Sequence, residues 1–265
     1  MAPRPAAAQQ VSERRVRAAL EDVARGLGQA VAGGSPLTAP AATTGGLGHF
    51  HLGASGALTR LEIEDPQRDS GTLRFVLPVG TANAALGLWK GWSLAPGISG
   101  TGALDLIGRA GPVVARQDLA DNALLFAAGL RVGLLGEGTV APAVSVSAFR
   151  AWTERLEYGD PAGDDVSFSG EVSTVSLRAD LSKALLFLTP YAGAGIDRTQ
   201  LDAAYRIPPS SGSDGPEIQG RVEPSSTHQK FYAGLQFGLL ALSASVEIGV
   251  YDGGGFGAAG LRLGF

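Results

Sequence analysis

Long stretches of the chain alternate between apolar residues and polar or small residues with a period of two, as β-strands with two unlike faces do. The clearest example is the C-terminal stretch over 241–265, where a glycine-rich turn at 252–255 separates two such runs. In the last run one face holds Leu261, Leu263 and Phe265, and the other holds Gly260, Arg262 and Gly264. The glycine-rich face would cover a soluble surface thinly, so the bulky face must meet something apolar, and lipid is the leading candidate.

The same alternation predicts eight further strands upstream. They span about residues 47–58, 75–89, 101–109, 123–135, 140–157, 165–182, 187–200 and 228–240. Within 165–182 the first half, with Val172, is out of phase with the second, so we expect a bulge near Ser173. The pattern as a whole predicts an all-β fold, a closed antiparallel transmembrane β-barrel of about ten strands within a range of roughly eight to twelve.

The connections between these strands alternate in length. Every second one is long and polar, at about 65–72, 110–121, 158–165 and 205–227. The others are mostly tight, as at 136–139, with 90–100 as the exception. Membrane barrels have short periplasmic turns and longer outer loops, so we expect the long set on the outer side.

Residues 11–31 follow a helical pattern instead. Val16, Leu20, Val23 and Leu27 recur at three- and four-residue steps, and the stretch after the helix reads as a linker. We therefore divide the chain into an N-terminal extension over 1–45 and a barrel over 46–265. The sequence leaves three positions open for the helix: packed on the periplasmic rim, inside the lumen as a plug, or part of a disordered or partner-binding tail.

Composition agrees with a barrel and narrows the partners. The chain has 265 residues, 39 glycines and no cysteine. No stretch approaches the ~18 uninterrupted apolar residues of a transmembrane helix, so a membrane location requires a barrel. The net charge of -4 gives no reason to expect a nucleic-acid partner. The first residues lack the apolar run of a secretory signal, and because a barrel protein must be exported we expect the sequence to begin near a processing site.

The last six residues, Gly260-Leu261-Arg262-Leu263-Gly264-Phe265, resemble the C-terminal signature of bacterial outer-membrane β-barrels of the small porin-like or OmpA-like class. Ala258 departs from the pattern, because a polar residue is usual there. The stretch Pro190 to Gly195 also resembles strands common in small barrels of this class. The resemblance implies location in the cell outer membrane, contact with its lipid, and reading of Gly260, Leu263 and Phe265 by the barrel-assembly machinery.

Aromatic residues near the predicted strand ends suggest an interfacial girdle. They are Trp89, Trp92, Trp152, Tyr158, Tyr205, Tyr251 and Phe265.

Charged and histidine side chains on the polar strand faces are the candidate lumen lining. They are His49, His51, Asp105, Arg131, Arg178, Asp180, Asp197, Glu247 and Arg262. They either pair with one another across a narrow lumen or line a pathway for a solute. His49 and His51 lie about 7 Å apart on one strand face and would bind a metal only with a carboxylate from another strand. We expect ordinary polar lining there, with no metal and no cofactor.

His228 follows three hydroxyl residues at the end of the longest connection, which invites a hydrolase interpretation. The spacing supplies no orienting acid and no nucleophile elbow, so we expect no catalytic residues and no enzyme. The favoured function is passive passage or binding of a small polar or amphiphilic solute. The alternatives are a closed structural or surface-interaction barrel and, third, an outer-membrane enzyme acting on lipid.

Overall fold

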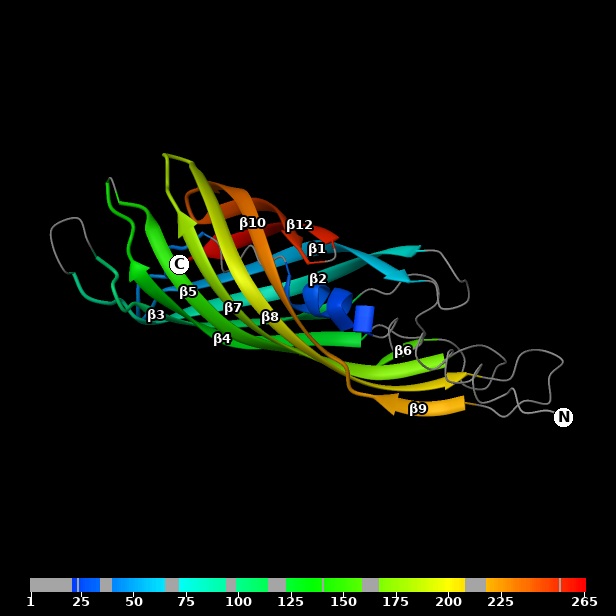
Figure 1. Cartoon of the computed structure of the whole chain (residues 1–265). Coiled ribbons are helices and arrows are strands. Elements are labelled where there is room, and N and C mark those ends of the chain that lie inside the picture. The colour runs from blue at the N-terminus through cyan, green and yellow to red at the C-terminus, as the bar shows by residue number, and fades with distance from the viewer. Residues whose placement is uncertain are drawn as a thin grey trace, which may run out of the picture.

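The computed structural model describes most of the chain. The described residues are 21–22, 24–33, 40–64, 72–93, 99–113, 123–139, 141–158, 167–207, 218–252 and 254–265. They form twelve strands in one antiparallel sheet (Figure 1). The strands are β1 Phe50–Glu64, β2 Thr72–Trp89, β3 Leu104–Val113, β4 Ala123–Leu135, β5 Ala143–Thr153, β6 Leu156–Tyr158, β7 Ser167–Ser182, β8 Leu188–Ile207, β9 Ile218–Val222, β10 Ser225–Leu239, β11 Leu242–Tyr251 and β12 Gly254–Gly264.

Ten of these strands close into a barrel. Consecutive strands pair as hairpins, and the ring is completed by β12 against β1, with Leu263 opposite Leu52. The short β6 pairs only with β7 and continues β5, while β9 pairs with β8 and continues β10. The predicted closed antiparallel barrel of about ten strands is therefore confirmed. Closure matters because it leaves no unpaired edge in the barrel wall.

The two open ends of the barrel differ. At one end, here called the C-terminal rim, the backbones of Phe50 and Phe265 exchange two hydrogen bonds of 3.0 Å and their rings stack 5.1 Å apart. The tight turns after β7 and β10 lie at the same end. The other end, here called the loop rim, carries β6 and β9 (Figure 1). The predicted long connections lie at this end of the strands, but residues 65–71, 114–122, 159–166 and 208–217 are outside the described residues.

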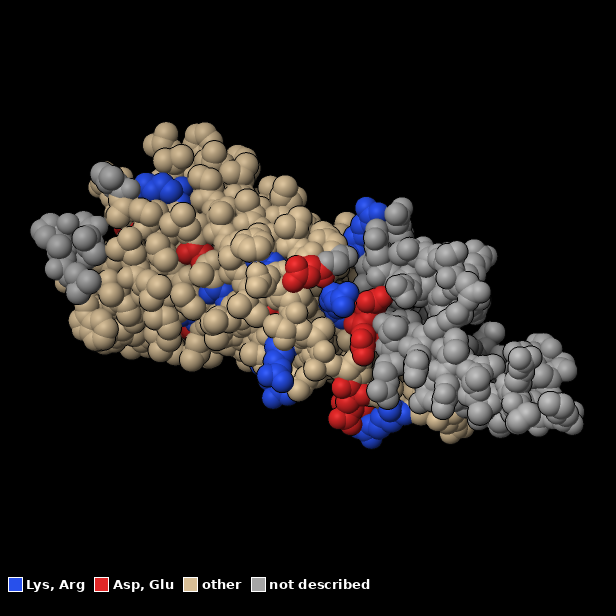
Figure 2. Space-filling model, in the orientation of Figure 1, with Lys and Arg blue, Asp and Glu red and all other residues tan. Residues whose placement is uncertain are grey.

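The outward face of the strands is an apolar belt, as the sequence predicts. Side chains that point outward include Leu52, Leu106, Leu177, Phe237, Val246 and Leu261, each 45–59 % exposed. Toward the loop rim the outward positions become charged, at Arg60, Arg150, Arg198 and Asp252. In Figure 2 most of the belt is uncharged, and the charged atoms of the visible face gather toward the loop rim. An apolar band with a polar margin is the outer surface of a barrel that sits in lipid.

A helix occupies the lumen. Residues 21–22 and 24–32 are helical, and Figure 1 draws this segment in blue, enclosed by the strands. Ala24, Leu27 and Val31 are buried in a cluster with wall residues that include Leu125 and Leu201. Of the three positions left open by the sequence, the described part of the helix takes the plug position. Residues 11–20 of the predicted helix lie outside the described residues. No helix in the described part of the chain is long and apolar enough to cross a membrane.

The predicted bulge near Ser173 is wrong. Ser173 pairs with Trp152 and Gly170 pairs with Leu156, so three residues of the β5–β6 segment face two residues of β7. The extra residue therefore lies between β5 and β6, and β7 runs through without a change of phase. Val172 points inward and is 1 % exposed because this half of the lumen is apolar, where the helix packs.

Two further expectations need correction. Tyr205 and Tyr251 do not belong to a girdle, since each is only 7 % exposed and faces the interior. The other predicted girdle residues are exposed, at Trp89, Trp92, Trp152 and Phe265, and the side chain of Tyr158 is not described. The connection predicted over 205–227 is also shorter than expected, because β8 continues to Ile207 and β9 takes up Ile218–Val222.

Candidate functional site

The lumen contains a layer of charged side chains between the helix and the C-terminal rim. Its first group joins β3 to β4, where Arg131 donates hydrogen bonds to Asp105 from Nε at 2.9 Å and Nη2 at 2.7 Å. Both side chains are fully buried. Such a pair is strong in a low dielectric but costs much desolvation, so each remaining polar atom needs a partner.

The N-terminal extension supplies some of those partners. Thr44 donates to the Asp105 carboxylate from its backbone N–H and, at 2.6 Å, from its hydroxyl. Arg131 Nη1 donates to the carbonyl oxygen of Pro40 at 3.4 Å, and Ser182 Oγ accepts from the backbone N–H of Ala41 at 3.0 Å. The segment over 40–44 is thus attached to the wall inside the barrel.

A second group lies nearer the loop rim. Lys230 on β10 contacts both oxygens of Asp197 on β8, at 2.6 and 2.8 Å, and both side chains are fully buried. Ser176 on β7 donates a short hydrogen bond to the same carboxylate. His228 Nε2 lies 3.5 Å from Asp197 Oδ2. The group therefore joins three neighbouring strands around one carboxylate.

Two cations of the wall reach the last turn of the luminal helix. Arg178 Nη2 donates a short hydrogen bond to the carbonyl oxygen of Ala32, and Lys230 Nζ lies 3.4 Å from the same oxygen. Carbonyl groups at a helix C-terminus have no partner within the helix and carry partial negative charge, so cations are favourable there. This contact fixes the inner end of the plug.

Aromatic rings hold Arg178 in position. Its guanidinium carbon lies 4.8 Å from the centre of the Phe149 ring and 5.8 Å from that of Tyr232. Tyr232 in turn donates a 2.5 Å hydrogen bond to Asp180. Cation–π contacts of this kind are stronger when the cation is desolvated, as it is here.

The structure brings most of the predicted lumen residues inside the barrel, but not into one cluster. Asp105 pairs with Arg131, and Asp197 pairs with Lys230. Asp180 accepts a hydrogen bond from Tyr232, whose ring also contacts Arg178. The buried Glu247 and the half-buried Arg262 occupy the neighbouring strands β11 and β12. His51 is half-buried and His49 is exposed, both near the C-terminal rim. Among the described residues no group of three histidine or carboxylate side chains is placed to hold a metal.

Sequence reasoning missed two cations of this layer, Lys230 and Arg109. Each lies an even number of residues from a side chain that points inward on the same strand, Lys230 from Tyr232 and Arg109 from Asp105. This alternation could have placed both cations in the lumen. Sequence reasoning also missed that Asp197 would lie beside His228, since the two are far apart in sequence and meet only because β8 pairs with β10. Neither ring nitrogen of His228 makes a hydrogen bond within the described residues.

The residues of the expected assembly signal lie at the β1–β12 junction. Leu263 and Phe265 point outward, 44 % and 58 % exposed, and Gly260 lies between Ser55 and Ser245. Recognition of this end by an assembly machinery stays a prediction.

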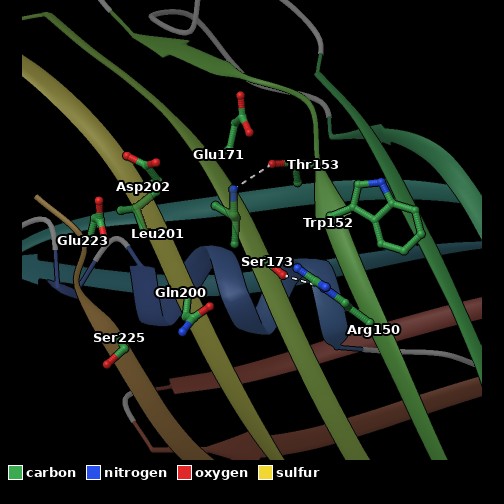
Figure 3. Close-up of a pocket in the computed structure, with 11 residues that line it drawn as sticks. Arg150, Trp152, Thr153, Glu171, Ser173, Gln200, Leu201, Asp202, Glu223 and Ser225 are labelled. Atoms are coloured by element: carbon green, nitrogen blue, oxygen red, sulfur yellow. Dashed lines mark hydrogen bonds between the residues drawn. The ribbon is translucent and has the colours of Figure 1, made fainter. Parts of the chain in front are cut away.

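A hollow of about 730 Å³ on the outside of the barrel is a second candidate site (Figure 3). It lies where the apolar belt meets the polar margin, and its lining includes Trp152, Glu171, Asp202 and Glu223. Arg221 pairs with Asp202 and, at 3.8 Å, with Glu223, and its hydrogen bonds hold the pKa of Asp202 below the ordinary value. Because its carboxylates are already paired and exposed, this hollow ranks after the lumen.

Three solved structures similar to this one are outer-membrane proteins. The outer membrane protease OmpT from Escherichia coli is 12 % identical, with a TM-score of 0.41 over 82 % of this chain and 96 % of that one. The N-terminal β-barrel domain of Pseudomonas aeruginosa OprF is 15 % identical, with a TM-score of 0.30 over 83 % and 99 %. The attachment invasion locus protein Ail of Yersinia pestis is 12 % identical, with a TM-score of 0.34 over 82 % and 97 %. No protein-family model and no curated protein sequence matches the chain.

The prediction that the chain is not an enzyme is contradicted, because the similar structures include an outer membrane protease. The chain folds as an outer-membrane β-barrel whose lumen is filled by its own N-terminal segment.

Proposed function

We propose that this outer-membrane barrel passes or binds a small polar solute, and that its N-terminal segment acts as the gate of the lumen. The observation that carries the proposal is the buried guanidinium of Arg109 in the charged layer. Its Nε and Nη1 atoms make no hydrogen bond within the described residues, although the side chain is only 8 % exposed. A buried donor without an acceptor is costly, and a polar solute in the lumen supplies acceptors.

The construction of the wall supports a movable plug. The pairs Asp105–Arg131 and Lys230–Asp197 are made between wall residues alone. These two ion pairs remain when the plug leaves, and the wall atoms that lose a partner include those bonded to Thr44, Pro40 and Ala32. The plug itself is held by hydrogen bonds at a few points and by apolar side chains of one short helix, among them Ala24, Leu27 and Val31.

The charge of the layer indicates which solutes it favours. Five cationic side chains, Arg109, Arg131, Arg178, Lys230 and Arg262, face four carboxylates, Asp105, Asp180, Asp197 and Glu247. With the two signs nearly balanced, the open lumen is expected to discriminate weakly by charge, with a slight preference for anions.

A closed structural barrel is the second candidate. Complete burial of Arg131, Lys230 and Asp197 favours it, because a tightly filled interior leaves no path through the charged layer while the plug is in place. The two candidates differ in what happens when the plug is released.

Current through planar bilayers separates them. The chain lacks cysteine, so the double variant Gly28→Cys/Thr199→Cys introduces a single disulfide between the helix and β8. A Cβ atom on Gly28 would stand 2.7 Å from the Thr199 Cβ, so a shift of about 1 Å brings the pair to disulfide geometry.

We expect the oxidised variant to stay closed, and the reduced variant to open under voltage as the unmodified protein does. The matched control is Thr199→Cys alone, which should not respond to the redox state. If neither the unmodified protein nor the reduced variant ever conducts, and Gly28→Leu, which displaces the helix, conducts no better, passage is refuted and the closed barrel stands.

A further inference from the structure

Two side chains of opposite charge are buried in the lumen without partners. Arg109 on β3 is 8 % exposed, and its Nε and Nη1 atoms make no hydrogen bond within the described residues. Glu247 on β11 is 2 % exposed, and neither of its carboxylate oxygens accepts a hydrogen bond there. The Tyr191 hydroxyl lies beside Glu247 but donates to the backbone carbonyl oxygen of Val246 at 3.3 Å. Because a buried charge without a partner is costly, each group favours a ligand that supplies the missing contact.

The strand register gives the tilt of the barrel, and with it the height of each residue. From Gly87 on β2, paired residues followed strand by strand around the ring lead to Gly254 on β12. A Cβ atom on Gly254 would stand 2.7 Å from the carbonyl oxygen of Arg60 on β1, and Arg60 pairs with Val76 on β2. One circuit of the ten strands thus runs from Gly87 to Val76, eleven residues nearer the loop rim. Positions of equal height therefore shift by about one residue per strand, as expected for the tilted strands of a closed barrel.

This tilt places Arg109 and Glu247 at the same height. The row of paired residues that contains Arg109, followed the other way through β2, β1 and β12, reaches Ser243 on β11. In that direction the row descends toward the C-terminal rim, so over four strands equal height lies about four residues nearer the loop rim than Ser243, at Glu247. Three strands separate β3 from β11 on one side and five on the other. The two side chains therefore face each other across the lumen.

The two charges interact but do not pair. Glu247 is one of the charged groups that act on Arg109, yet the two form no ion pair in the described part of the chain. Arg178 and Lys230 also act on Glu247, but both are already engaged, by a carbonyl oxygen at the helix end and by Asp197. A ring of ten strands about 4.8 Å apart and tilted by about 40° is roughly 20 Å across. With the plug displaced, a small molecule is enough to connect the two charged ends.

We infer that the open lumen binds a small zwitterion of the amino-acid type, with its carboxylate against Arg109 and its ammonium group against Glu247. The guanidinium donates to the carboxylate, and the ammonium group donates to the side chain of Glu247. A solute with a single charge leaves one of the two wall groups without a partner, so it binds more weakly. The inference rests on the proposed function, because the plug must move before a solute reaches the pair.

Block of the salt current by 4-aminobutyrate tests the inference on the full-length, unmodified barrel. This zwitterion has no net charge at neutral pH and carries no current, so a bound molecule lowers the potassium chloride current of an open barrel. Butyrate lacks its ammonium group and propylammonium lacks its carboxylate, which makes them matched controls. We expect half-block by 4-aminobutyrate at a concentration about tenfold lower than by either control, since each lacks one hydrogen-bonded charged contact.

Variants of the two residues assign the binding to this pair. Glu247→Gln should weaken block by 4-aminobutyrate to the level of butyrate, and Arg109→Gln should weaken it to the level of propylammonium. The exchange Arg109→Glu with Glu247→Arg should restore the preference for the zwitterion, which then binds in the reverse orientation. Glu157→Gln is the control, because Glu157 is exposed on β6 at the loop rim, and it should keep the full preference. A gel shift on heating shows that each variant has folded.

Three outcomes would overturn the inference. Equal block of the unmodified barrel by all three compounds would do so and leave salt passage standing. A preference for 4-aminobutyrate that survives Glu247→Gln would place the binding elsewhere. A barrel that passes no salt in any open period would refute the proposed function and the inference with it, so the two failures are distinguishable.

Discussion

Arg178 on β7 donates a hydrogen bond to the carbonyl oxygen of Ala32, although the two residues are 146 positions apart in the chain. The contact joins the barrel wall to the end of the luminal helix. It stands beside Phe149 and Tyr232, which restrict the guanidinium. The inner end of the plug is thus held by Arg178 together with Lys230, whose Nζ lies 3.4 Å from the same oxygen.

Replacing Arg178 should loosen the plug. We expect Arg178→Met to raise the fraction of time for which a single barrel conducts, because the helix loses one of the two cationic contacts at the carbonyl oxygen of Ala32. Lys183→Met is the control, since Lys183 Nζ donates to the carbonyls of Gly138, Thr139 and Ala141 and lies 4.0 Å from Glu137, all of which belong to the wall and not to the plug. Equal current from both variants would contradict this role of Arg178.

A side chain at position 28 should push the helix away from β8. A Cβ atom on Gly28 would meet Thr199 Oγ1 at 2.0 Å, a distance that forces a shift. Gly28→Leu should therefore open the lumen, even though leucine favours a helix over glycine by up to about 1 kcal/mol. Adding Thr199→Gly should restore closure.

Gly238→Leu is the matched control for that prediction, because a Cβ there has no neighbour within 4 Å. The readout is again single-channel current, with a thermal gel shift to show that the barrels are folded. A Gly28→Leu barrel as silent as Gly238→Leu would show that the helix accommodates the larger side chain.

Two aspartates on β8 allow a comparison of buried and exposed ion pairs. Asp197→Asn leaves Lys230 buried without its counter-charge, and we expect a loss of about 3–5 kcal/mol in the free energy of unfolding. Asp202→Asn breaks the exposed pair with Arg221 and should cost only about 0–1 kcal/mol. Denaturant unfolding in lipid vesicles measures both. Similar losses would mean that solvent reaches Asp197.

The apolar belt predicts that the loss of stability caused by an outward-facing arginine depends on how deep the residue lies in the lipid. Val246 is the middle one of five outward apolar residues on β11, and Val246→Arg should destabilise the barrel in lipid by about 2–4 kcal/mol. Leu240→Arg, at the fully exposed turn of the C-terminal rim, should cost about 0–1 kcal/mol. If the order is reversed, the belt does not face lipid.

The sequence predicts the barrel well because each strand has two unlike faces in unlike surroundings. The alternation alone assigns residues such as Leu261 and Val246 to the lipid side. Pairing of β12 with β1 then follows because the barrel must close. The contents of the lumen are harder to predict, because they depend on a segment that meets the wall only in three dimensions. Val172 is an example. Its apolar side chain on the inward face suggested that the alternation changes phase within the strand, but the side chain packs in the lumen with the helix.

The candidate site is predicted only as a set of inward charges. Asp105 and Arg131 were both expected in the lumen, but their pairing depends on the register of β3 and β4. Lys230 was overlooked although its parity is inward, and its contact with Ala32 depends on the path of the N-terminal extension. The sequence thus supplies the charges, and the register and the plug decide which of them meet.

The closed junction between β1 and β12 also constrains how the molecule is made. The enclosed segment precedes β1 in the chain and leaves the translation and export machinery first, whereas its enclosure is complete only when the final strand, β12, pairs with β1. Either the segment is already inside the lumen when β12 pairs with β1, or its free end is threaded through the closed barrel afterwards. The order of events in biogenesis is therefore constrained, because the segment before β1 can be enclosed only once β12 has paired with β1.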